Sequence, residues 1–486
     1  MKIEIENLGP IKQFEFDIEK DFHIIYGENN IGKSYAINTI YILLKYLVVE
    51  PINLSKLISR HLLDQEKLPE IEDLNDIVNA KLTDEKYREF TITKKCEEIL
   101  KKGIEAEYVT SISKSFKNSF SSFYNMRNKL SNKQLVLKIL LRNFNLIIKL
   151  SKNNELYLDE LQLKKRITVR FIDTNRNVKI EEDKIILYIK KSEFGLENFQ
   201  KEILFVVHHE MENSIRSLKN SISDIYFFPA SRSGLYQAMN IFSSVFAELS
   251  KVRHIVNSQI SIPALSEPVS DYFLKLSTIK INTTSDKYAK IAKEMEKNLL
   301  NGEVVFNKET KKIEYVEKKT KLRLDLSETS SMVSEISPIV AYLKYVINEI
   351  QIKDDSSDAY NLIWGSEEGL EYNNSKKLIF IEEPEAHLHP KIQIKLIEYF
   401  SKLINNNIKI VLTTHSDFIS NKLTNLILSE DLSFEKISSC HLIMTKEGSI
   451  DKGDMQATQE GIDDYNFLGV SEELYEERMK LSNPEN

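Results

Sequence analysis

Residues 27–34 read Gly27-Glu28-Asn29-Asn30-Ile31-Gly32-Lys33-Ser34. This run fits the pattern GxxxxGK[ST], in which backbone N–H groups surround phosphates, the lysine neutralises their charge and the serine hydroxyl binds Mg²⁺. A compact apolar run at 22–26 precedes it, and apolar side chains recur at helical spacing from Ser34 to about Val49. The loop is therefore expected between a buried strand and a helix, as the pattern requires. We predict that all eight residues bind ATP, with Mg²⁺ at Ser34.

Two adjacent acids, Glu382 and Glu383, follow the apolar run Leu378–Ile381. A phosphate-binding loop needs one carboxylate to hold the hydrated Mg²⁺ and another to orient or deprotonate the attacking water, and two adjacent acids can divide these tasks. Taken alone, the pair is equally typical of a solvated acidic turn that caps a strand. Because a phosphate loop lies upstream, we predict that Glu382 binds the metal and that Glu383 is catalytic.

His415 stands at the end of a second such run, Ile408–Leu412, after two threonines. Both runs are typical of buried parallel strands, whose functional residues stand at their carboxyl ends. An imidazole placed there can hydrogen-bond a γ-phosphate and report whether it is present. A lone histidine at a strand end is more often structural, but its position one strand after the paired acids favours a catalytic role.

Ser330 and Ser331 open a segment whose apolar residues recur at helical spacing. The free N–H groups and hydroxyls at such a helix end can bind an anion, although serines there are by themselves only a helix cap. Arg232 follows another buried strand, and two interpretations of it stay open. It is either a phosphate or partner contact, or a solvated arginine in a loop.

The composition is that of an ordinary globular protein, with 486 residues, 42% hydrophobic and 29% charged, enough for two or three domains. The most apolar segment, Leu135–Leu150, is interrupted by three basic residues, so neither a membrane span nor a signal peptide is predicted, and we expect a cytoplasmic protein. The two cysteines, far apart in sequence, suit a reducing compartment. The net charge of −7 does not exclude a local basic face.

We expect one domain to be formed by two separate parts of the sequence, with a second domain inserted between them. Residues 1–50 and 222–486 carry the motifs, and residues 51–221 are predicted to form an inserted, mainly helical lobe with a few strands. Within the lobe we expect strands near Ile167–Phe171 and Lys184–Ile189 and a helix over roughly Asn198–Ser221. The later segment is expected to contain a helix near 286–300 and a hairpin-like stretch over 303–326.

Together these motifs resemble the ABC-type ATPase heads of the OLD, RecF and SMC group, which are often placed among AAA-like ATPases. The resemblance rests on ENLGPIKQFEF (6–16), YGENNIGKS (26–34), the serine cluster at 330, LIFIEEPEAHLHP (378–390) and VLTTHS (411–416), with YFFPASRSG (226–234) as a weaker match. It implies an α/β fold, in which a mixed sheet carries the phosphate loop and is flanked by helices.

In that family two heads sandwich two ATP molecules, so the resemblance implies a homodimer or a higher oligomer. By the match, Lys33 and Ser34 serve phosphate and Mg²⁺, Glu382 is the Walker B acid, and Glu383 is the catalytic base. By the same match, His415 is the switch histidine, which reports whether the γ-phosphate is present. Ser330 and Ser331 would contact the nucleotide of the other head, and 385–390 would reach across the dimer. The chain departs from the family at Glu382, where many relatives have aspartate, and at Met332, where glycine is common.

OLD nucleases carry a further nuclease domain after the head. The acids after His415, such as Asp451 and Asp454, have no strand framework typical of a two-metal site, so no nuclease activity is predicted.

An ATPase head that carries an inserted lobe of its own resembles the ATPase subunits of bacterial antiphage systems such as PARIS and Septu. This implies a separately encoded effector, a nuclease or toxin, and a phage-derived trigger. The alternative is a RecF-like DNA repair ATPase, for which Lys164-Lys165-Arg166 or Lys311-Lys312 would contact DNA phosphates. A transport ATPase is disfavoured because no membrane-coupling segment is recognisable.

Overall fold

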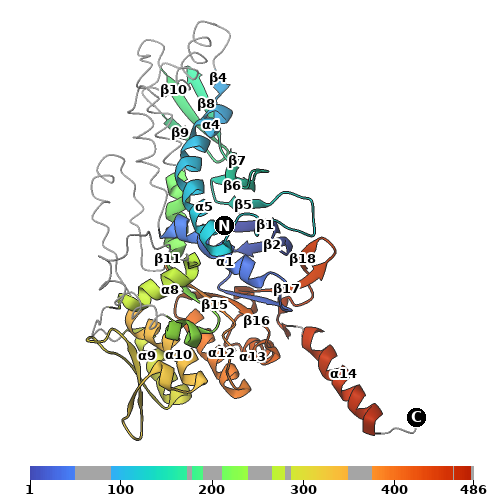
Figure 1. Ribbon diagram of the computed structural model, residues 1–486. Coiled ribbons are helices and arrows are strands. Elements are labelled where there is room, and N and C mark those ends of the chain that lie inside the picture. Colours follow the sequence, from blue (N-terminus) through green and yellow to red (C-terminus); the bar gives the residue numbers. More distant parts are fainter. Residues whose placement is uncertain are drawn as a thin grey trace, which may run out of the picture. The chain divides into compact units, whose positions relative to one another are not determined.

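The computed structural model describes residues 1–49, 89–171, 178–189, 211–238, 265–279, 286–347, 375–462 and 465–482 (Figure 1). They belong to two compact units. Unit 1 comprises Met1–Ile18 and Ile42–Lys219, and unit 2 comprises Glu19–Tyr41 and Asn220–Asn486. The boundary between the units falls within helix α1 (Lys33–Val48).

Unit 2 is built on a mixed sheet in which five parallel neighbours are followed by one antiparallel strand. In spatial order these strands are β11 (Ile222–Phe228), β15 (Lys376–Glu382), β16 (Ile408–Thr414), β3 (Phe22–Gly27), β17 (Ile437–Thr445) and β18 (Gly448–Asp451). Every residue of β3 and of β16 is buried. Because parallel strands are covered on both faces, their sequences are continuous apolar runs and do not alternate with polar residues.

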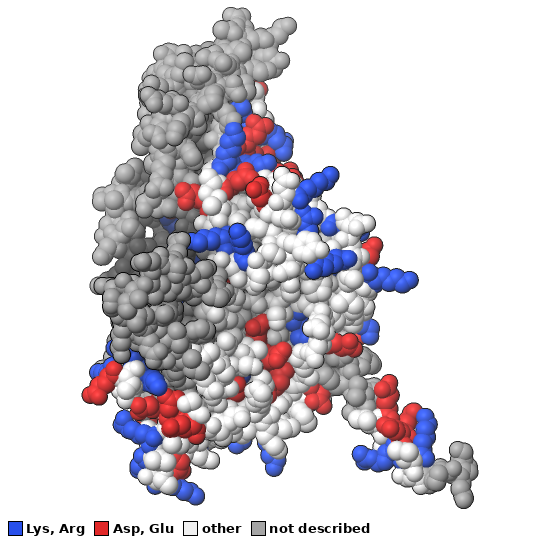
Figure 2. Space-filling model, in the orientation of Figure 1, with Lys and Arg blue, Asp and Glu red and all other residues white. Residues whose placement is uncertain are grey.

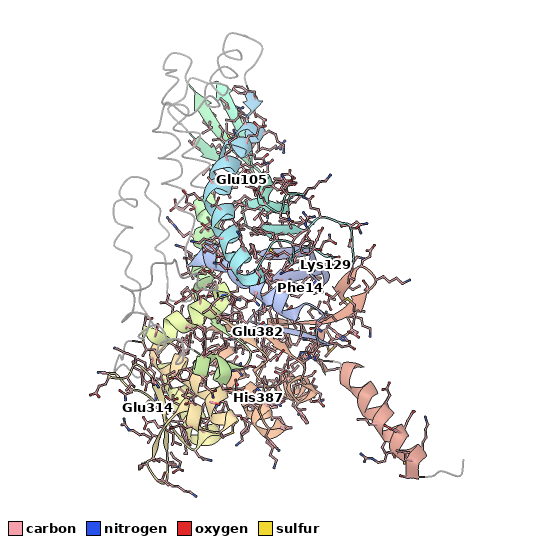
Figure 3. The ribbon with its side chains drawn as sticks, viewed as in Figure 1. Phe14, Glu105, Lys129, Glu314, Glu382 and His387 are labelled. Atoms are coloured by element: carbon pink, nitrogen blue, oxygen red, sulfur yellow. The ribbon has the colours of Figure 1, made fainter. Side chains whose placement is uncertain are left out.

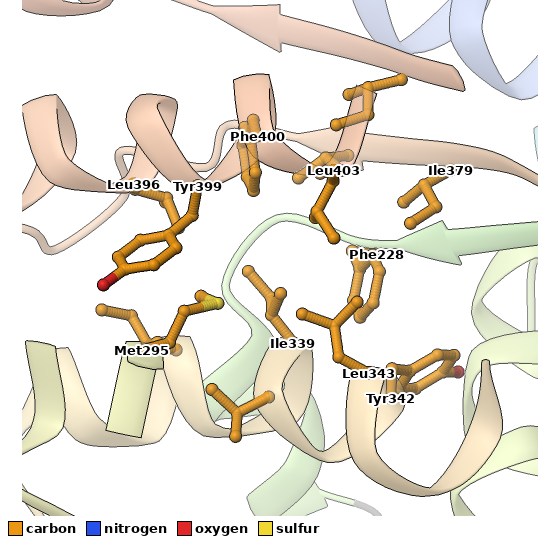
Figure 4. Packing of buried hydrophobic residues seen from close by; sticks show 14 of the residues in the cluster. Phe228, Met295, Ile339, Tyr342, Leu343, Ile379, Leu396, Tyr399, Phe400 and Leu403 are labelled. Atoms are coloured by element: carbon orange, nitrogen blue, oxygen red, sulfur yellow. The ribbon is translucent and has the colours of Figure 1, made fainter. Parts of the chain in front are cut away.

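Helices cover both faces of these strands. Ile379 and Ile381 of β15 join a large apolar cluster with the helices of the later chain (Figure 4). Phe380 points the other way, and its ring lies 5.5 Å from that of Tyr41 on α1. The helices that contribute to the cluster are α8 (Glu267–Ser277), α9 (Lys287–Met295), α10 (Ser331–Ala341), α12 (Pro390–Ile404) and α13 (Asp417–Leu428). The central strand β15 therefore has apolar contacts on both of its faces.

Smaller elements complete unit 2. They are the antiparallel β12 (Gly302–Phe306), β13 (Ile313–Glu317) and β14 (Arg323–Asp325), the pair β19 (Ala457–Thr458) and β20 (Gly461–Ile462), the short helices η3 (Glu296–Leu300), η4 (Leu326–Glu328), η5 (Tyr342–Val346) and η7 (Phe434–Lys436), and the helix α14 (Tyr465–Ser482).

Unit 1 contains an antiparallel series of strands with side chains that alternate between buried and exposed. In spatial order these are β2 (Ile11–Asp17), β1 (Lys2–Leu8), β5 (Val136–Leu140), β6 (Phe144–Leu150) and β7 (Leu156–Leu163). A second sheet has the order β4 (Glu89–Thr91), β8 (Arg166–Phe171), β10 (Lys184–Ile189) and β9 (Val178–Ile180). The helices of unit 1 include α4 (Thr93–Ile104), η2 (Glu105–Val109) and α5 (Thr110–Phe120).

The α/β fold with a mixed sheet is confirmed. The two strands predicted near Ile167–Phe171 and Lys184–Ile189 form β8 and β10, which pair in parallel. The helix and hairpin predicted over 286–326 are also present as α9, η3 and β12–β14. Of the predicted helix Asn198–Ser221, residues 198–210 lie outside the described part, and residues 211–221 are helical.

The apolar segment Leu135–Leu150 forms β5 and β6. Among the described helices, none has the length and apolar character needed to span a bilayer. The expected division into a head and an inserted lobe stays a prediction, and the described part of 51–221 contains the seven strands β4–β10 beside its helices.

At the amino ends of the parallel strands, one buried acid holds two lysines. Asp21, just before β3, contacts Lys376 of β15 at 2.6 Å and Lys409 of β16 at 2.9 Å. Burial alone would raise the pKa of Asp21, but the hydrogen bonds from these two lysines outweigh it and lower the pKa below its usual value. Asp21 thus stays ionised and ties three strands together.

Replacing Asp21 by asparagine is expected to destabilise the folded chain by about 3–5 kcal/mol, because two lysines then face an uncharged partner in a largely buried position. Urea denaturation measures the change. The control is Glu294→Gln, which removes an ion pair to Lys402 that is half exposed on both sides and is expected to cost less than about 1 kcal/mol. Equal effects of the two substitutions would contradict the assigned role of Asp21.

Candidate functional site

The loop from Gly27 to Gly32 joins β3 to α1 in a conformation that only certain residues adopt easily. Gly27 has φ +144°, Asn30 has φ +62° and Gly32 has φ +110°. A Cβ atom on Gly27 would lie 2.8 Å from the carbonyl oxygen of Leu442 on the neighbouring β17. Glu28, Asn29 and Asn30 are exposed, as is Ser34, while Ile31 and Gly32 are buried. The loop therefore presents the free N–H groups of the first turn of α1 at the sheet edge, where they can bind an anion.

Lys33 places its ammonium group inside this loop. Its Nζ donates to the carbonyl oxygen of Gly27 at 2.8 Å and to that of Glu28 at 2.7 Å. Burial lowers the pKa of Lys33 to about 8, while the carboxylates of Glu383 and Glu385 act in the opposite direction. At neutral pH the loop is thus occupied by a positive charge that has two carbonyl partners and two nearby anions.

Glu382 is the last residue of β15 (Figure 3). The Ser34 hydroxyl and the Ala230 N–H donate to its carboxylate, but burial dominates and raises the pKa of Glu382 to about 7. Its Oε1 is buried without a hydrogen-bond partner among the described residues. A serine hydroxyl beside a carboxylate oxygen that lacks a partner suits Mg²⁺, which prefers oxygen ligands and would compensate the buried charge.

Glu383 and His415 meet at the same edge of the sheet. The Nε2 of His415 lies 3.6 Å from Oε1 of Glu383, and both side chains are partly exposed. The nearby His415 imidazole lowers the pKa of Glu383, against the effect of burial, so Glu383 is ionised at neutral pH. Its backbone has φ +43°, an uncommon conformation for glutamate. The N–H of Glu383 donates to the carbonyl oxygen of Thr413 at 3.1 Å, which holds that conformation in place.

A third acid, Glu385, was given no role of its own by the sequence analysis. Its Oε1 accepts hydrogen bonds from the Thr414 hydroxyl at 2.8 Å and from the backbone N–H of His415 at 2.6 Å. Burial raises the pKa of Glu385 in spite of these bonds. Glu385 thus positions the segment that carries His415. The signal in the sequence was a third acid directly after Pro384, but a pattern alone does not say which of three acids faces which partner.

The two serines of the cluster at 330, Ser330 and Ser331, lie on a different element from the phosphate loop. Ser330 is the N-cap of α10, where its hydroxyl accepts from the N–H of Val333 at 3.4 Å, and Ser331 is the first residue of the helix. Both are exposed. Their predicted contact with a nucleotide therefore involves the solvent-facing end of α10 and stays a prediction.

Arg232 matches neither of the two interpretations that the sequence left open. Its side chain is fully buried, with 0% exposure, and it forms an ion pair with Glu335 of α10 at 3.2 Å. Its Nη1 also donates to the carbonyl oxygens of Pro229 and Glu382. A solvated arginine is excluded by this burial, and Glu335, its partner, was not recognised in the sequence.

A comparison with protein families identifies the family of this chain. A family model described as the AAA ATPase domain matches residues 1–420. The chain belongs to the AAA ATPase domain family. It is thus an ATPase of this type, and the residues gathered around the loop are its candidate nucleotide site. No curated protein sequence matches the chain significantly.

Solved structures similar to this AAA ATPase include heads of SMC proteins. The SMC head domain from Thermotoga maritima is 8% identical, with a TM-score of 0.33 over 92% of this chain and 96% of that one. An Smc head with an extended coiled coil, bound to the C-terminal domain of ScpA from Pyrococcus furiosus, is 11% identical, with a TM-score of 0.33 over 98% of each chain. An SmcHead bound to the C-winged helix domain of ScpA is 10% identical, with a TM-score of 0.32 over 93% of this chain and 97% of that one.

Replacing Gly27 by alanine is expected to abolish ATP binding or to weaken it at least about tenfold, because the added Cβ meets backbone atoms of β17 and the φ of +144° is strained for alanine. Gly234→Ala is the matched control, since a Cβ there has no atom within 4 Å and its φ is not in the left-handed region. Calorimetric titration with ATP compares the two. Equal affinities would show that the conformation of Gly27 does not shape the loop.

The dependence of kcat/KM on pH is expected to be bell-shaped, with limbs set by Glu382 and Lys33. Below about pH 7 Glu382 takes up a proton and loses its metal-binding charge, and above about pH 8 Lys33 loses its proton and its attraction for phosphate. ATP binding without Mg²⁺ should keep the alkaline limb alone. Raising the Mg²⁺ concentration should move the acid limb to lower pH, because the metal binds the ionised form.

Glu385 is the control group for this profile, since the pKa of its carboxyl is also raised. The acid limb should persist in Glu385→Gln. An acid limb that does not respond to Mg²⁺ would contradict its assignment to Glu382.

Proposed function

We propose that this chain hydrolyses ATP at the edge formed by β3, β15 and β16 and that two copies act together as paired heads. The observation that carries the proposal is the arrangement of Lys33, Glu382 and Glu383 around the loop, where three ionisable groups have three different environments. Lys33 is buried within the loop, Glu382 is half-buried beside Ser34, and Glu383 is accessible and paired with His415. Such separation of pKa values is typical of sites that assign distinct chemical roles to similar groups.

Each side chain then has a defined task. The backbone N–H groups of the loop and Lys33 bind the phosphates of ATP, and Lys33 exchanges its two carbonyl partners for phosphate oxygens. Ser34 and Glu382 hold the bound Mg²⁺, which neutralises charge on the phosphates. Glu383, ionised and partly exposed, accepts hydrogen bonds from water and orients it for attack. His415 fixes the Glu383 carboxylate and contacts the terminal phosphate.

The proposal includes a dimer because Ser330 and Ser331 of α10 lie on a different element from the phosphate loop. They can therefore contact the nucleotide of a second copy. Ser330 and Ser331 offer two exposed hydroxyls and the free N–H groups of an 11-residue helix, a combination that suits a nucleotide phosphate of a second copy. The resemblance to paired heads supports the same arrangement. ATP would then hold the two copies together, and hydrolysis would release them.

The biological role that we propose is that of the ATPase subunit of a bacterial antiphage system that controls a separately encoded effector. This rests on the resemblance to PARIS and Septu ATPase subunits. The DNA repair alternative has less support in the described residues. Arg166 pairs with Asp183 at 2.9 Å, and Lys312 pairs with Asp325 at 3.1 Å. On the face shown in Figure 2, acidic and basic side chains are interspersed and form no broad basic surface over the described residues.

The proposal is tested by ATP turnover and particle size of the wild type, Lys33→Ala and Glu383→Gln. Both substitutions are expected to lower kcat by about 10²–10⁴-fold. Glu383→Gln should still bind ATP and should form a larger particle with it, whereas Lys33→Ala should do neither. A wild-type chain without ATP binding or turnover would overturn the proposal.

The biological role is tested in the same preparations. Co-purification of a neighbouring gene product whose toxicity depends on this chain supports the antiphage role. Binding to duplex DNA that weakens steeply with salt, without such a partner, would favour the repair alternative.

A further inference from the structure

Arg232, the first residue of the helical segment 232–238 that follows β11, connects two parts of unit 2 to which the proposed reaction gives separate tasks. Its Nη1 donates to the backbone carbonyl oxygen of Glu382, the metal-binding acid, at 3.1 Å. Its Nε donates to the backbone carbonyl oxygen of Glu335 on α10, also at 3.1 Å. One rigid, planar guanidinium group is therefore bonded to the main chain of β15 and to that of α10.

Glu335 closes the connection from the other side. Its Oε2 accepts from the backbone N–H of Arg232 at 3.1 Å, and its Oε1 accepts from the backbone N–H and the hydroxyl of Ser233 at 3.2 and 2.6 Å. These N–H groups belong to the first turn of the helical segment 232–238, where a carboxylate is favoured by the helix dipole. The two residues are thus joined by an ion pair, and the side chain of each also forms a hydrogen bond with the backbone of the other.

The energetics do not favour a purely stabilising role. Both side chains have 0% exposure, and removing two charges from water offsets most of the attraction between them. The Nη2 of Arg232 is also buried without a hydrogen-bond partner among the described residues, which costs about 1–3 kcal/mol. An apolar pair of similar size would give a comparable or greater stability. The charges are better explained by the geometry that they impose.

We propose that Arg232 and Glu335 are positioning residues that couple Glu382 to the amino end of α10, so that metal and ATP at one head set the position of Ser330 and Ser331 for the second copy. The inference rests on the proposed function. Its physical basis is that Glu382 cannot shift by more than a few tenths of an ångström without breaking the bond to Nη1. Arg232 then either moves with β15 and carries α10 along, or loses its partner in a buried position.

The test compares Arg232→Lys, Arg232→Gln and Glu335→Gln with the wild type. Lysine keeps the charge but cannot bond to β15 and α10 in the same fork, and glutamine at 335 keeps the shape but removes the charge. Each is expected to lower kcat by about 10–100-fold and to raise the Mg²⁺ concentration for half-maximal activity about tenfold. The affinity for ATP without Mg²⁺ should change less than about threefold. In the Glu383→Gln background, each should abolish the ATP-dependent increase in particle size.

The double variant Arg232→Gln, Glu335→Gln should lose no more than the single variants, because residues that act as one unit are not additive. Asp21→Asn is the matched control, since the Asp21–Lys409 pair is similarly buried but lies at the amino ends of the parallel strands, away from the carboxyl end of β15 that carries Glu382. It should lower stability and leave the Mg²⁺ requirement and the particle size unchanged.

The outcomes separate the inference from the proposed function. If the wild type hydrolyses ATP and enlarges with it, but the Arg232 and Glu335 variants behave like Asp21→Asn, the coupling is wrong and the ATPase stands. If the wild type shows neither property, the proposed function fails first. Glu335→Gln is nearly isosteric with the native residue, so a folded variant without any kinetic change would overturn the inference directly.

Discussion

The structure of unit 2 depends on one constraint, which is that the parallel strands β15, β16 and β3 are buried on both faces and therefore end in register at one edge. Burial on both faces makes polar side chains costly within the strands, so the strand ends are where polar side chains can gather. Glu382, Thr413 and the start of the phosphate loop occupy these ends. Neighbouring strands are about 4.8 Å apart, so groups that are distant in the sequence lie close enough together to contact a single nucleotide.

The same constraint explains the distribution of charge. At the amino ends of these strands Asp21 holds two lysines, and at the carboxyl ends Lys33 lies near the carboxylates of Glu383 and Glu385. Burial raises the pKa of Glu382 and of Glu385, so these acids carry a desolvation cost at the carboxyl ends. The divalent metal that we propose at Ser34 and Glu382 would lower this cost.

The sequence predicted the parts of the site that depend on local pattern. The loop 27–34 and the buried runs before Glu382 and His415 each combine a short apolar strand with polar residues at its end, and the helix of 33–48 follows from spacing alone. The pairing of Glu383 with His415 could be anticipated because both follow adjacent strands. The serine N-cap of α10 was equally recognisable. None of these needed information from distant residues beyond the rule that parallel strands share an edge.

Arg232, Glu335 and Glu385 could not be predicted, and the reason is common to all three. Their environment is set by long-range packing, and a charged residue in a sequence is by default a solvated one. Glu335 lies among apolar residues on α10, so its neighbours indicate a core position, and a buried acid is tolerable only beside a partner that the sequence does not identify. A solvent-facing salt bridge would leave α10 free to shift relative to β15. The fully buried pair does not, because Arg232 is paired with Glu335 of α10 and also donates to the carbonyl oxygen of Glu382 on β15. The end of α10 therefore depends on the position of Glu382.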